Sequence, residues 1–308
     1  MWVRSSAVLW LACVALGCGQ RQPPTIVVIT PTGGVEYWDI FNRAVKATAS
    51  TNFRVELAAP QSVTDYTEQA HMVENAVSRH VQGIIVAPSH QLVLTSVLRN
   101  AVQAHIPVIV VGSPIALSAN EYAAFIGWDE AEAGRFAAKK LITSIGGKGE
   151  VGIVAVSPTV ESDSLIEKGF ESEIAQAPHV KLVSVRYGLS DWARGRQAIL
   201  DLITEHPNIR GIFTTDEFST HAAAYAFNPG TKRRPVLIGV SEEKNELTAL
   251  SEGRIDALVI SNPKDLGTRA TQAMLAAVSG GVATSAKLPV QIVDRESLAG
   301  NALLKSLN

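Results

Sequence analysis

Acidic side chains that follow two apolar runs are among the residues of this chain that could do chemistry. Asp216 and Glu217 follow the run GIFTT, and Glu242 follows VLIGVS. Two carboxyl groups at a suitable separation can serve as the acid and the base of a hydrolase. No motif sets the distance between Asp216 and Glu242. Two interpretations therefore stay open: these acids are the catalytic groups of a hydrolase, or they are polar anchors for a bound ligand.

Other signatures of catalysis are missing from the sequence. The seven histidines are scattered and form no HExxH pattern, which argues against a catalytic zinc site. The segment Gly146-Gly147-Lys148-Gly149 has no Ser or Thr after its lysine and precedes a strand, so it predicts a turn and not a phosphate-binding loop. No GxSxG elbow accompanies the serines. We expect a protein that is not an enzyme, with no metal and no cofactor.

Aromatic residues stand where a ligand could stack on them. Tyr37 and Trp38 follow the loop after the first apolar run, TIVVIT. An aromatic ring can stack on the apolar face of a sugar or on a planar base. Trp38 could instead begin the core stripe of the next helix with Phe41 and Val45. For Tyr37 we favour contact with a ligand.

Two further tryptophans have similar alternatives. Trp192, in the segment SDWARG, could face a ligand, or it could pack beside Asp191 while that aspartate caps a helix. Trp128 and Asp129 follow the predicted strand at 124–127 and could contact a ligand or act as hinge residues.

The first 18 residues have the layout of an export signal. Arg4 precedes the apolar run from Ala7 to Leu16, and Gly17 is the small residue before a cut at Cys18. The pattern resembles a bacterial lipoprotein signal, although Ala15 stands where such signals usually have Leu. We expect lipid attachment at Cys18, a tether over 19–24, and a location in the periplasm or at the cell surface. The alternative is the apolar N-terminal helix of a cytosolic protein.

Composition excludes several classes of protein. The chain has 308 residues, enough for two lobes. Without Arg4 the 27 basic residues become 26, against 29 acidic ones, and a net charge of −3 is not that of a nucleic-acid binder. The two cysteines, Cys13 and Cys18, both belong to the signal, so the remaining chain has none for a disulfide. Beyond the signal, no apolar stretch approaches the ~20 residues of a membrane helix.

Short β-branched runs alternate with segments of helical periodicity along the whole chain. We predict strands at 25–30, 54–58, 83–87, 107–111, 124–127, 151–156, 180–187, 211–215, 236–240, 257–260 and 290–293. We predict helices at 37–50, 67–79, 92–104, 130–145, 164–176, 193–205, 220–227, 243–252 and 263–278. This alternation indicates an α/β fold in which helices wind around parallel sheets, with one pattern repeated in two halves.

Four segments carry a resemblance to a known family. They are ITPTGGVEYW, VQGIIVAPS followed by AHIPVIVVGS, FIGWDEAEAGRFAAKKL, and VLIGVSEEKNELTALSEGRIDALVISNP. As a set they resemble the type I periplasmic binding proteins, the family of ribose-binding proteins and of the lac-repressor core. The resemblance implies two Rossmann-like lobes joined by three crossings, near Gly127, Ser261 and Ala286. The lobes would comprise 25–127 plus 262–286 and 128–261 plus 287–308, with the ligand between them.

The charged positions that sugar-binding members use are altered in this sequence. The family's Asp-Arg pair aligns with Gly112-Ser113, and its next arginine aligns with Ser164. Small hydroxyls also replace the Asn, Asp and Gln that follow later strands, so recognition should differ from that of ribose. The ligand-binding residues that we predict are Tyr37, Trp38, Ser113, Trp128, Asp129, Trp192, Thr215, Asp216, Ser241, Ser261 and Asn262.

These features predict an extracytoplasmic lipoprotein that captures a small polar solute for an ABC importer. The solute would be a sugar or a sugar-like molecule, such as a polyol or nucleoside, and closure of the two lobes would deliver it to the permease subunits. An alternative is a sensory partner of a membrane kinase or chemoreceptor. A sugar-responsive repressor is excluded in practice, because a signal stands where a helix-turn-helix would be.

Overall fold

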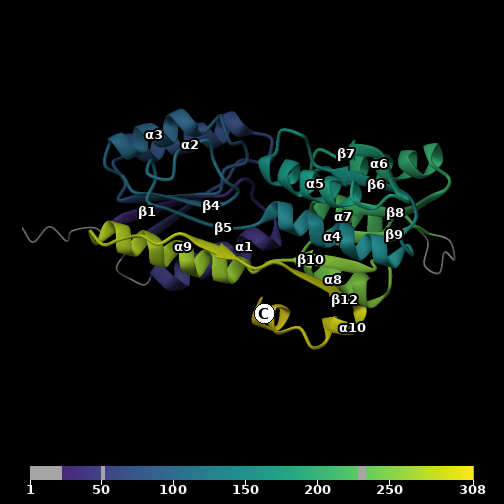
Figure 1. Ribbon diagram of the computed structural model, residues 1–308. Helices are drawn as coiled ribbons and strands as arrows, with labels where there is room; N and C mark the ends of the chain where they lie inside the picture. Colours follow the sequence, from purple (N-terminus) through teal and green to yellow (C-terminus); the bar gives the residue numbers. More distant parts are fainter. Residues whose placement is uncertain (1–22, 50–52, 228–233, 308) are drawn as a thin grey trace, which may run out of the picture.

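The computed structural model describes residues 23–49, 53–227 and 234–307, and Cys13 and Cys18 lie outside them. The chain forms two lobes, each built on one six-stranded sheet (Figure 1). In the first lobe lie β1 (Thr25–Ile29), α1 (Glu36–Ala49), β2 (Arg54–Ala58), α2 (Tyr66–Ser78), β3 (Gly83–Val86), α3 (Thr95–Gln103), β4 (Val108–Gly112), β5 (Ala124–Trp128), α9 (Pro263–Val278) and β11 (Ala286–Leu288).

The second lobe has the same plan. It contains α4 (Glu130–Ser144), β6 (Gly149–Ala155), α5 (Glu161–Ile174), β7 (Val180–Tyr187), α6 (Trp192–Glu205), β8 (Ile209–Thr214), α7 (Glu217–Ala224), β9 (Val236–Val240), α8 (Lys244–Ser251), β10 (Ala257–Ile260), β12 (Gln291–Asp294), α10 (Arg295–Leu298) and α11 (Ala302–Leu307).

Strand order is the same in the two sheets, apart from numbering. The orders are β2-β1-β3-β4-β5-β11 and β7-β6-β8-β9-β10-β12. All pairs are parallel except β10 with β12. This confirms the predicted α/β fold with two wound parallel sheets. In such sheets the crevice at the carboxyl ends of the strands is the usual place for a ligand.

Strand β1 shows why these apolar runs fold as central strands. Ile26 and Val28 belong to the core under α1 and α9, whereas Val27 and Ile29 belong to the core under α2 and α3. Because successive side chains of a strand point to opposite faces, a strand covered on both faces must be apolar at every position. The run TIVVIT meets that requirement.

The chain passes between the sheets at three places: after β5, after β10, and between β11 and β12. Our sequence analysis placed these crossings near Gly127, Ser261 and Ala286. The third passage lies between Leu288 and Gln291, because the three residues of β11 extend the first sheet beside β5. A strand of three residues is too short to show a period, which is why the sequence predicted only the strand after it.

The largest shifts of the other element boundaries are three residues, at the starts of α3, α5 and α7 and at the end of α7. Helix α5 begins at Glu161 and α7 begins at Glu217, each three residues before its predicted start. In α7 the cause is Asp216, whose carboxylate accepts a hydrogen bond from the Ser219 amide at 2.9 Å and so caps the helix. After β12 the chain forms α10 and α11, and Asp294 with Ser297 forms a capping box at the start of α10.

Helices α4 and α5 touch at glycine. A Cβ atom on Gly134 would lie 2.0 Å from the carbonyl oxygen of Ile166, and one on Gly169 would lie 2.1 Å from the carbonyl oxygen of Ala131. Only residues without a side chain allow the two backbones to approach this closely. The contact holds the first two helices of the second lobe together beside the cleft.

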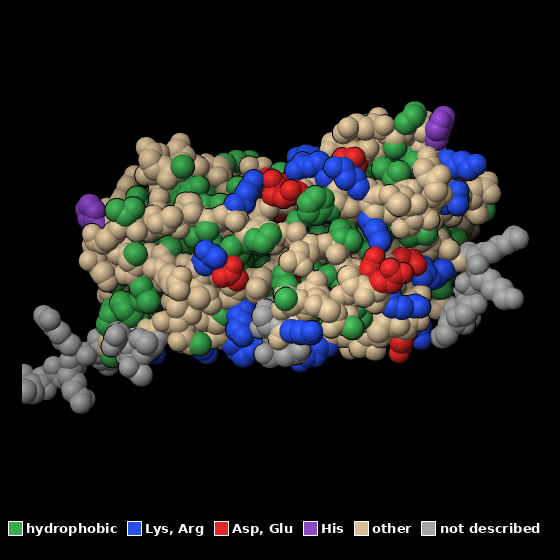
Figure 2. All heavy atoms as spheres, turned by 60° about the horizontal axis from the view of Figure 1, so that its bottom comes forward, with side chains coloured by type: hydrophobic (Ala, Val, Ile, Leu, Met, Phe, Trp, Pro, Cys, Tyr) green, Lys and Arg blue, Asp and Glu red, His purple; other side chains and the backbone are tan. Residues whose placement is uncertain are grey.

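Charged side chains of both signs are scattered over the side of the molecule drawn in Figure 2. Lys and Arg side chains are interspersed with Asp and Glu over this face, which comes forward when the bottom of Figure 1 is turned to the viewer. Within the part of the chain that the structure describes, no helix combines the length and apolarity needed to cross a membrane.

Candidate functional site

A cavity of about 200 Å³ lies between the two lobes. Its walls are the segments that follow the strands of both sheets. From the first lobe come Pro31, Thr32, Val35, Tyr37, Trp38, Gln61, Ser62, Val63, Ala87, Pro88, Ser89, Gly112, Ser113 and Trp128. From the second come Val156, Val160, Ser162, Asp163, Ile166, Ser190, Thr215, Asp216, Glu217, Phe218, Val240, Ser241, Glu242 and Glu243. The cavity is smaller than the roughly 300–1,000 Å³ of drug-sized sites, so it suits a small solute.

Trp38 has both of the roles that the sequence left open. Its ring packs edge-on against the buried Phe41, at 5.4 Å between centroids, and it also lines the cavity. Tyr37 lies edge-on to Trp38 at 4.9 Å and lines the cavity too. Gly112 has a φ of +70°, and a Cβ there would lie 3.9 Å from the Trp38 ring. The end of β4 thus lies beside the indole, and it is the positive φ that favours glycine there, since a Cβ at 3.9 Å would make an ordinary van der Waals contact.

Seven of the predicted ligand-binding residues line the cavity and four do not. Those that line it are Tyr37, Trp38, Ser113, Trp128, Thr215, Asp216 and Ser241. Asn262 instead caps α9 by accepting a hydrogen bond from the Asp265 amide at 3.0 Å. Trp192 is 47% exposed and lies in a shallower depression beside the cavity with Gly34. Asp191 caps α6, which is the helix-capping role that the sequence analysis gave as the alternative for this segment.

Asp129 and Ser261 act from outside the cavity. Asp129 caps α4 and pairs with Lys287 of β11 at 2.8 Å, so it ties together two of the segments that pass between the lobes. That pairing holds the pKa of Asp129 below its usual range. Ser261 is buried behind Glu242 and donates to its carboxylate at 2.8 Å, and it also lies 3.4 Å from the Tyr37 hydroxyl.

Sequence analysis missed several residues that line the cavity. They are chiefly Gln61, Ser62, Ser89, Ser162, Asp163, Ser190 and Phe218. The family comparison pointed to Ser164, but the early start of α5 places its neighbours Ser162 and Asp163 on the cavity instead. The usable signal was positional, since most of these residues follow a strand within a few positions.

Carboxyl groups dominate the second-lobe wall. Asp163, Asp216 and Glu242 are buried, and Glu217 and Glu243 are half-buried. Burial raises the pKa of Asp216 to about 6 and that of Glu242 to about 7. Burial, together with the nearby Asp216, also raises the pKa of Asp163 and of Glu217 well above the usual range. None of the described residues that line the cavity is Lys, Arg or His.

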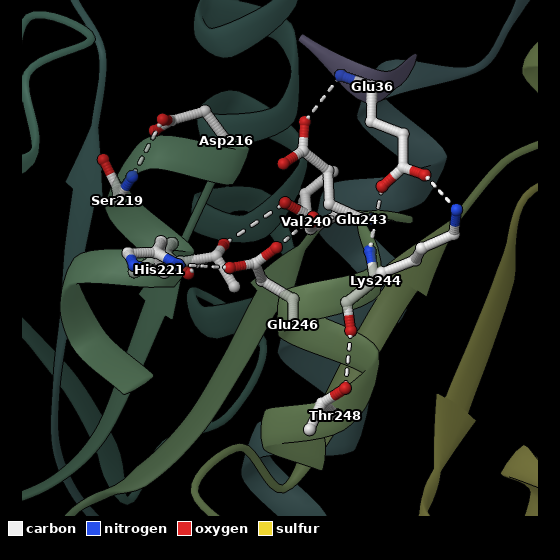
Figure 3. Close-up of polar contacts among 12 residues, drawn as sticks. Glu36, Asp216, Ser219, His221, Val240, Glu243, Lys244, Glu246 and Thr248 are labelled. Carbon is white, nitrogen blue, oxygen red and sulfur yellow. Dashed lines mark hydrogen bonds and ion pairs between the residues drawn. The ribbon is translucent and has the colours of Figure 1, made fainter. Parts of the chain in front are cut away.

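Hydrogen bonds across the cleft join the two lobes. The Glu36 amide donates to Glu243 Oε1 at 3.0 Å, and the Lys244 amide donates to Glu36 Oε2 at 3.1 Å (Figure 3). Lys244 Nζ also pairs with Glu36 Oε1 at 3.1 Å. We call Glu36, Glu243 and Lys244 the interlobe latch, because each glutamate satisfies the first amides of a helix in the opposite lobe.

The described acids of the cavity are not grouped as metal ligands. Across the ranges that the structure describes, no group of three or more His, Cys, Asp or Glu side chains is placed to hold a metal ion. Two of the buried carboxylates already accept hydrogen bonds from neighbouring hydroxyls: Asp163 from Thr215, and Glu242 from Ser261. The arrangement suits the binding of polar groups by hydrogen bonds, beside aromatic rings.

Comparison with known proteins agrees with this geometry. The D-allose-binding periplasmic protein of Escherichia coli strain K12 is 21% identical over 262 residues, which cover 82% of this chain and 84% of that relative. The ribose import binding protein of Bacillus subtilis is 22% identical over 213 residues, 68% of this chain and 67% of its own. A carbohydrate transporter solute-binding protein from Agrobacterium radiobacter, solved with D-arabinose, superimposes with a TM-score of 0.87 at 23% identity, covering 93% of this chain and 99% of that one.

A family model described as a periplasmic binding protein domain matches residues 26–281, which is most of the chain. The strand orders, the cleft between the lobes and the four sequence segments all agree with that match. The chain belongs to the periplasmic binding protein family, as the resemblance of its sequence predicted.

Proposed function

We propose that this protein captures a small sugar or sugar-like solute in the interlobe cavity and delivers it to the permease of an ABC importer. The observation that carries the proposal is the cavity itself, whose walls are the carboxyl ends of both sheets. A ligand there touches both lobes at once. It therefore stabilises the closed arrangement by the contacts that it makes only when the lobes are together.

The chemistry of the wall supports a polyhydroxylated ligand. Trp38 and Tyr37 offer aromatic faces from the first lobe, and Trp128 adds a third ring. Serine and threonine hydroxyls, with the carboxyl groups of the second lobe, offer donors and acceptors for sugar hydroxyls. The arginines that sugar-binding members use are replaced here, so the preferred solute should differ from ribose.

The test is binding of a panel of monosaccharides, polyols and nucleosides to the purified protein, measured by thermal shift and titration calorimetry. A ligand at one hundred times its dissociation constant should stabilise the folded protein by about 2.7 kcal/mol. Calorimetry should give one site per chain. Failure of every member of the panel to bind would refute the proposal. Chemical conversion of a bound member would replace our assignment of a binding protein by that of an enzyme.

We also propose that the protein is held at a membrane, outside the cytoplasm, by lipid on Cys18. Support comes from the signal-like first 18 residues and from membership of a periplasmic family. Metabolic labelling with palmitate in a bacterial host tests this. Label should be lost in Cys18→Ser and kept in Cys13→Ser, the matched control within the same segment. Equal labelling of both variants would contradict attachment at Cys18.

A further inference from the structure

The interlobe cavity has an unbalanced charge. Five carboxyl groups line it, and no basic side chain does so among the described residues. Two basic side chains beside the cavity are engaged with acids that do not line it: Lys244 pairs with Glu36, and His221 lies 2.7 Å from Glu246. Burial keeps some of these groups protonated, but a neutral sugar would bring no opposite charge to any that are ionised, such as Asp216 with its pKa of about 6.

Helix N-termini do not remove the imbalance. Asp163 lies in the first turn of α5, Asp216 caps α7, and Glu243 precedes α8, so each lies near the positive end of a helix. That positive end is equivalent to about half a charge per helix. The pKa values of Asp163 and Asp216 are nevertheless raised by burial, so the helix ends offset only part of the penalty of charging these groups.

Asp216 has an oxygen with nothing to bind. One carboxylate oxygen, Oδ1, accepts the hydrogen bond from the Ser219 amide that caps α7 (Figure 3). The other, Oδ2, has no hydrogen-bond partner among the residues that the structure describes, although Asp216 is only 8% exposed. Asp163 and Glu242, by contrast, each accept from a neighbouring hydroxyl. An unsatisfied buried carboxylate oxygen is costly unless a ligand supplies a donor.

The remaining features of the cavity restrict which kind of ligand could supply the hydrogen-bond donor for Asp216. The described acids are not arranged as metal ligands, which argues against a divalent cation. Trp38, Tyr37, Trp128 and Phe218 surround the same space, and aromatic faces attract organic cations within about 6 Å. The small volume admits a molecule of about the size of a monosaccharide.

We propose that the solute carries a protonated amino group, as in an amino sugar or an aminated cyclic polyol, and that Asp216 binds this ammonium. The inference rests on the proposed function and narrows its substrate class. The hydroxyl groups of the solute would face the serines and threonines, and its ring would lie against Trp38. The ammonium supplies both the missing positive charge and the donor for Asp216 Oδ2.

The experiment is calorimetric titration of the purified protein with matched pairs: glucosamine and glucose, galactosamine and galactose, mannosamine and mannose, and an aminated inositol with inositol. At least one amine should bind ten or more times more tightly than its neutral partner. Glucuronate should bind more weakly than glucose. Neutral members binding as tightly as every amine would overturn the inference and leave the proposed function standing. A panel in which nothing binds would overturn both.

Two variants separate recognition of the amine from a general loss of binding. Asp216→Asn keeps an oxygen to cap α7 but removes the negative charge, so it should weaken binding of the preferred amine at least tenfold. Its effect on the neutral partner should stay below threefold. The matched control is Asp191→Asn, which alters the exposed cap of α6 outside the cavity. It should change the binding of neither the amine nor its neutral partner. Equal losses for amine and neutral partner in Asp216→Asn would contradict the assigned contact.

Discussion

Replacing Glu242 with glutamine should make the stability of the ligand-free protein less dependent on pH. Glu242 is 7% exposed, and burial raises its pKa from 4.5 to about 7. Between pH 4.5 and about 7 the carboxyl group is therefore mostly protonated in the folded protein and mostly ionised in the unfolded chain. The stabilising effect of protonation is fully present below pH 4.5 and is lost as the pH rises through 7.

The size of the effect follows from the displacement of the pKa. One pKa unit corresponds to about 1.4 kcal/mol, so the change from 4.5 to about 7 makes the folded state less stable by about 3 kcal/mol above pH 7. Glutamine has no such charge. Its amide oxygen can also keep the two hydrogen bonds that Ser261 donates from its amide and hydroxyl.

The assay is urea unfolding of the wild type and of Glu242→Gln at pH 5, 6, 7 and 8. Between pH 5 and 8 the wild type should lose up to about 3 kcal/mol more than the variant does. Glu74→Gln, on the exposed face of α2, is the control and should follow the wild type. Parallel pH profiles for wild type and Glu242→Gln would refute the argument that burial of this carboxyl limits stability.

Three further outcomes are expected. Trp38→Ala should weaken solute binding at least tenfold in calorimetry, whereas the exposed Trp192→Ala should change it less than threefold; equal losses would reject the role of Trp38. Glu36→Ala removes part of the interlobe latch, a loss of roughly 1 kcal/mol. The radius of gyration of the ligand-free protein in X-ray scattering should therefore increase. An unchanged radius would argue against the latch. Gly134→Ala should destabilise by about 3 kcal/mol because its Cβ meets backbone at 2.0 Å, whereas Gly33→Ala, with 3.7 Å to its nearest neighbour, should be nearly neutral in urea unfolding.

Local sequence pattern predicted some residues of the site and missed others. Asp216, Thr215 and Ser241 were predicted because each follows a strand, and the carboxyl ends of parallel strands meet at one edge of the sheet. Asp163 was missed because its position on the cavity depends on where α5 begins. Trp192 was predicted to contact the ligand, but the cap at Asp191 starts α6 so that the indole lies beside the cavity and is about half exposed.

The sequence by itself determined the α/β fold, its two halves and, to within two residues, most of the boundaries of the predicted helices and strands. It could do so because apolar periodicity and helix-ending residues act locally along the chain. Only the tertiary structure decided which acids share the cavity, and that none of the described residues lining it with them is Lys, Arg or His. Acids far apart in the chain, such as Asp163 and Asp216, come together because the segments that follow two neighbouring strands pack side by side, and no local pattern records that proximity. Their raised pKa values have the same origin, because burial belongs to the assembled cleft and not to any one segment.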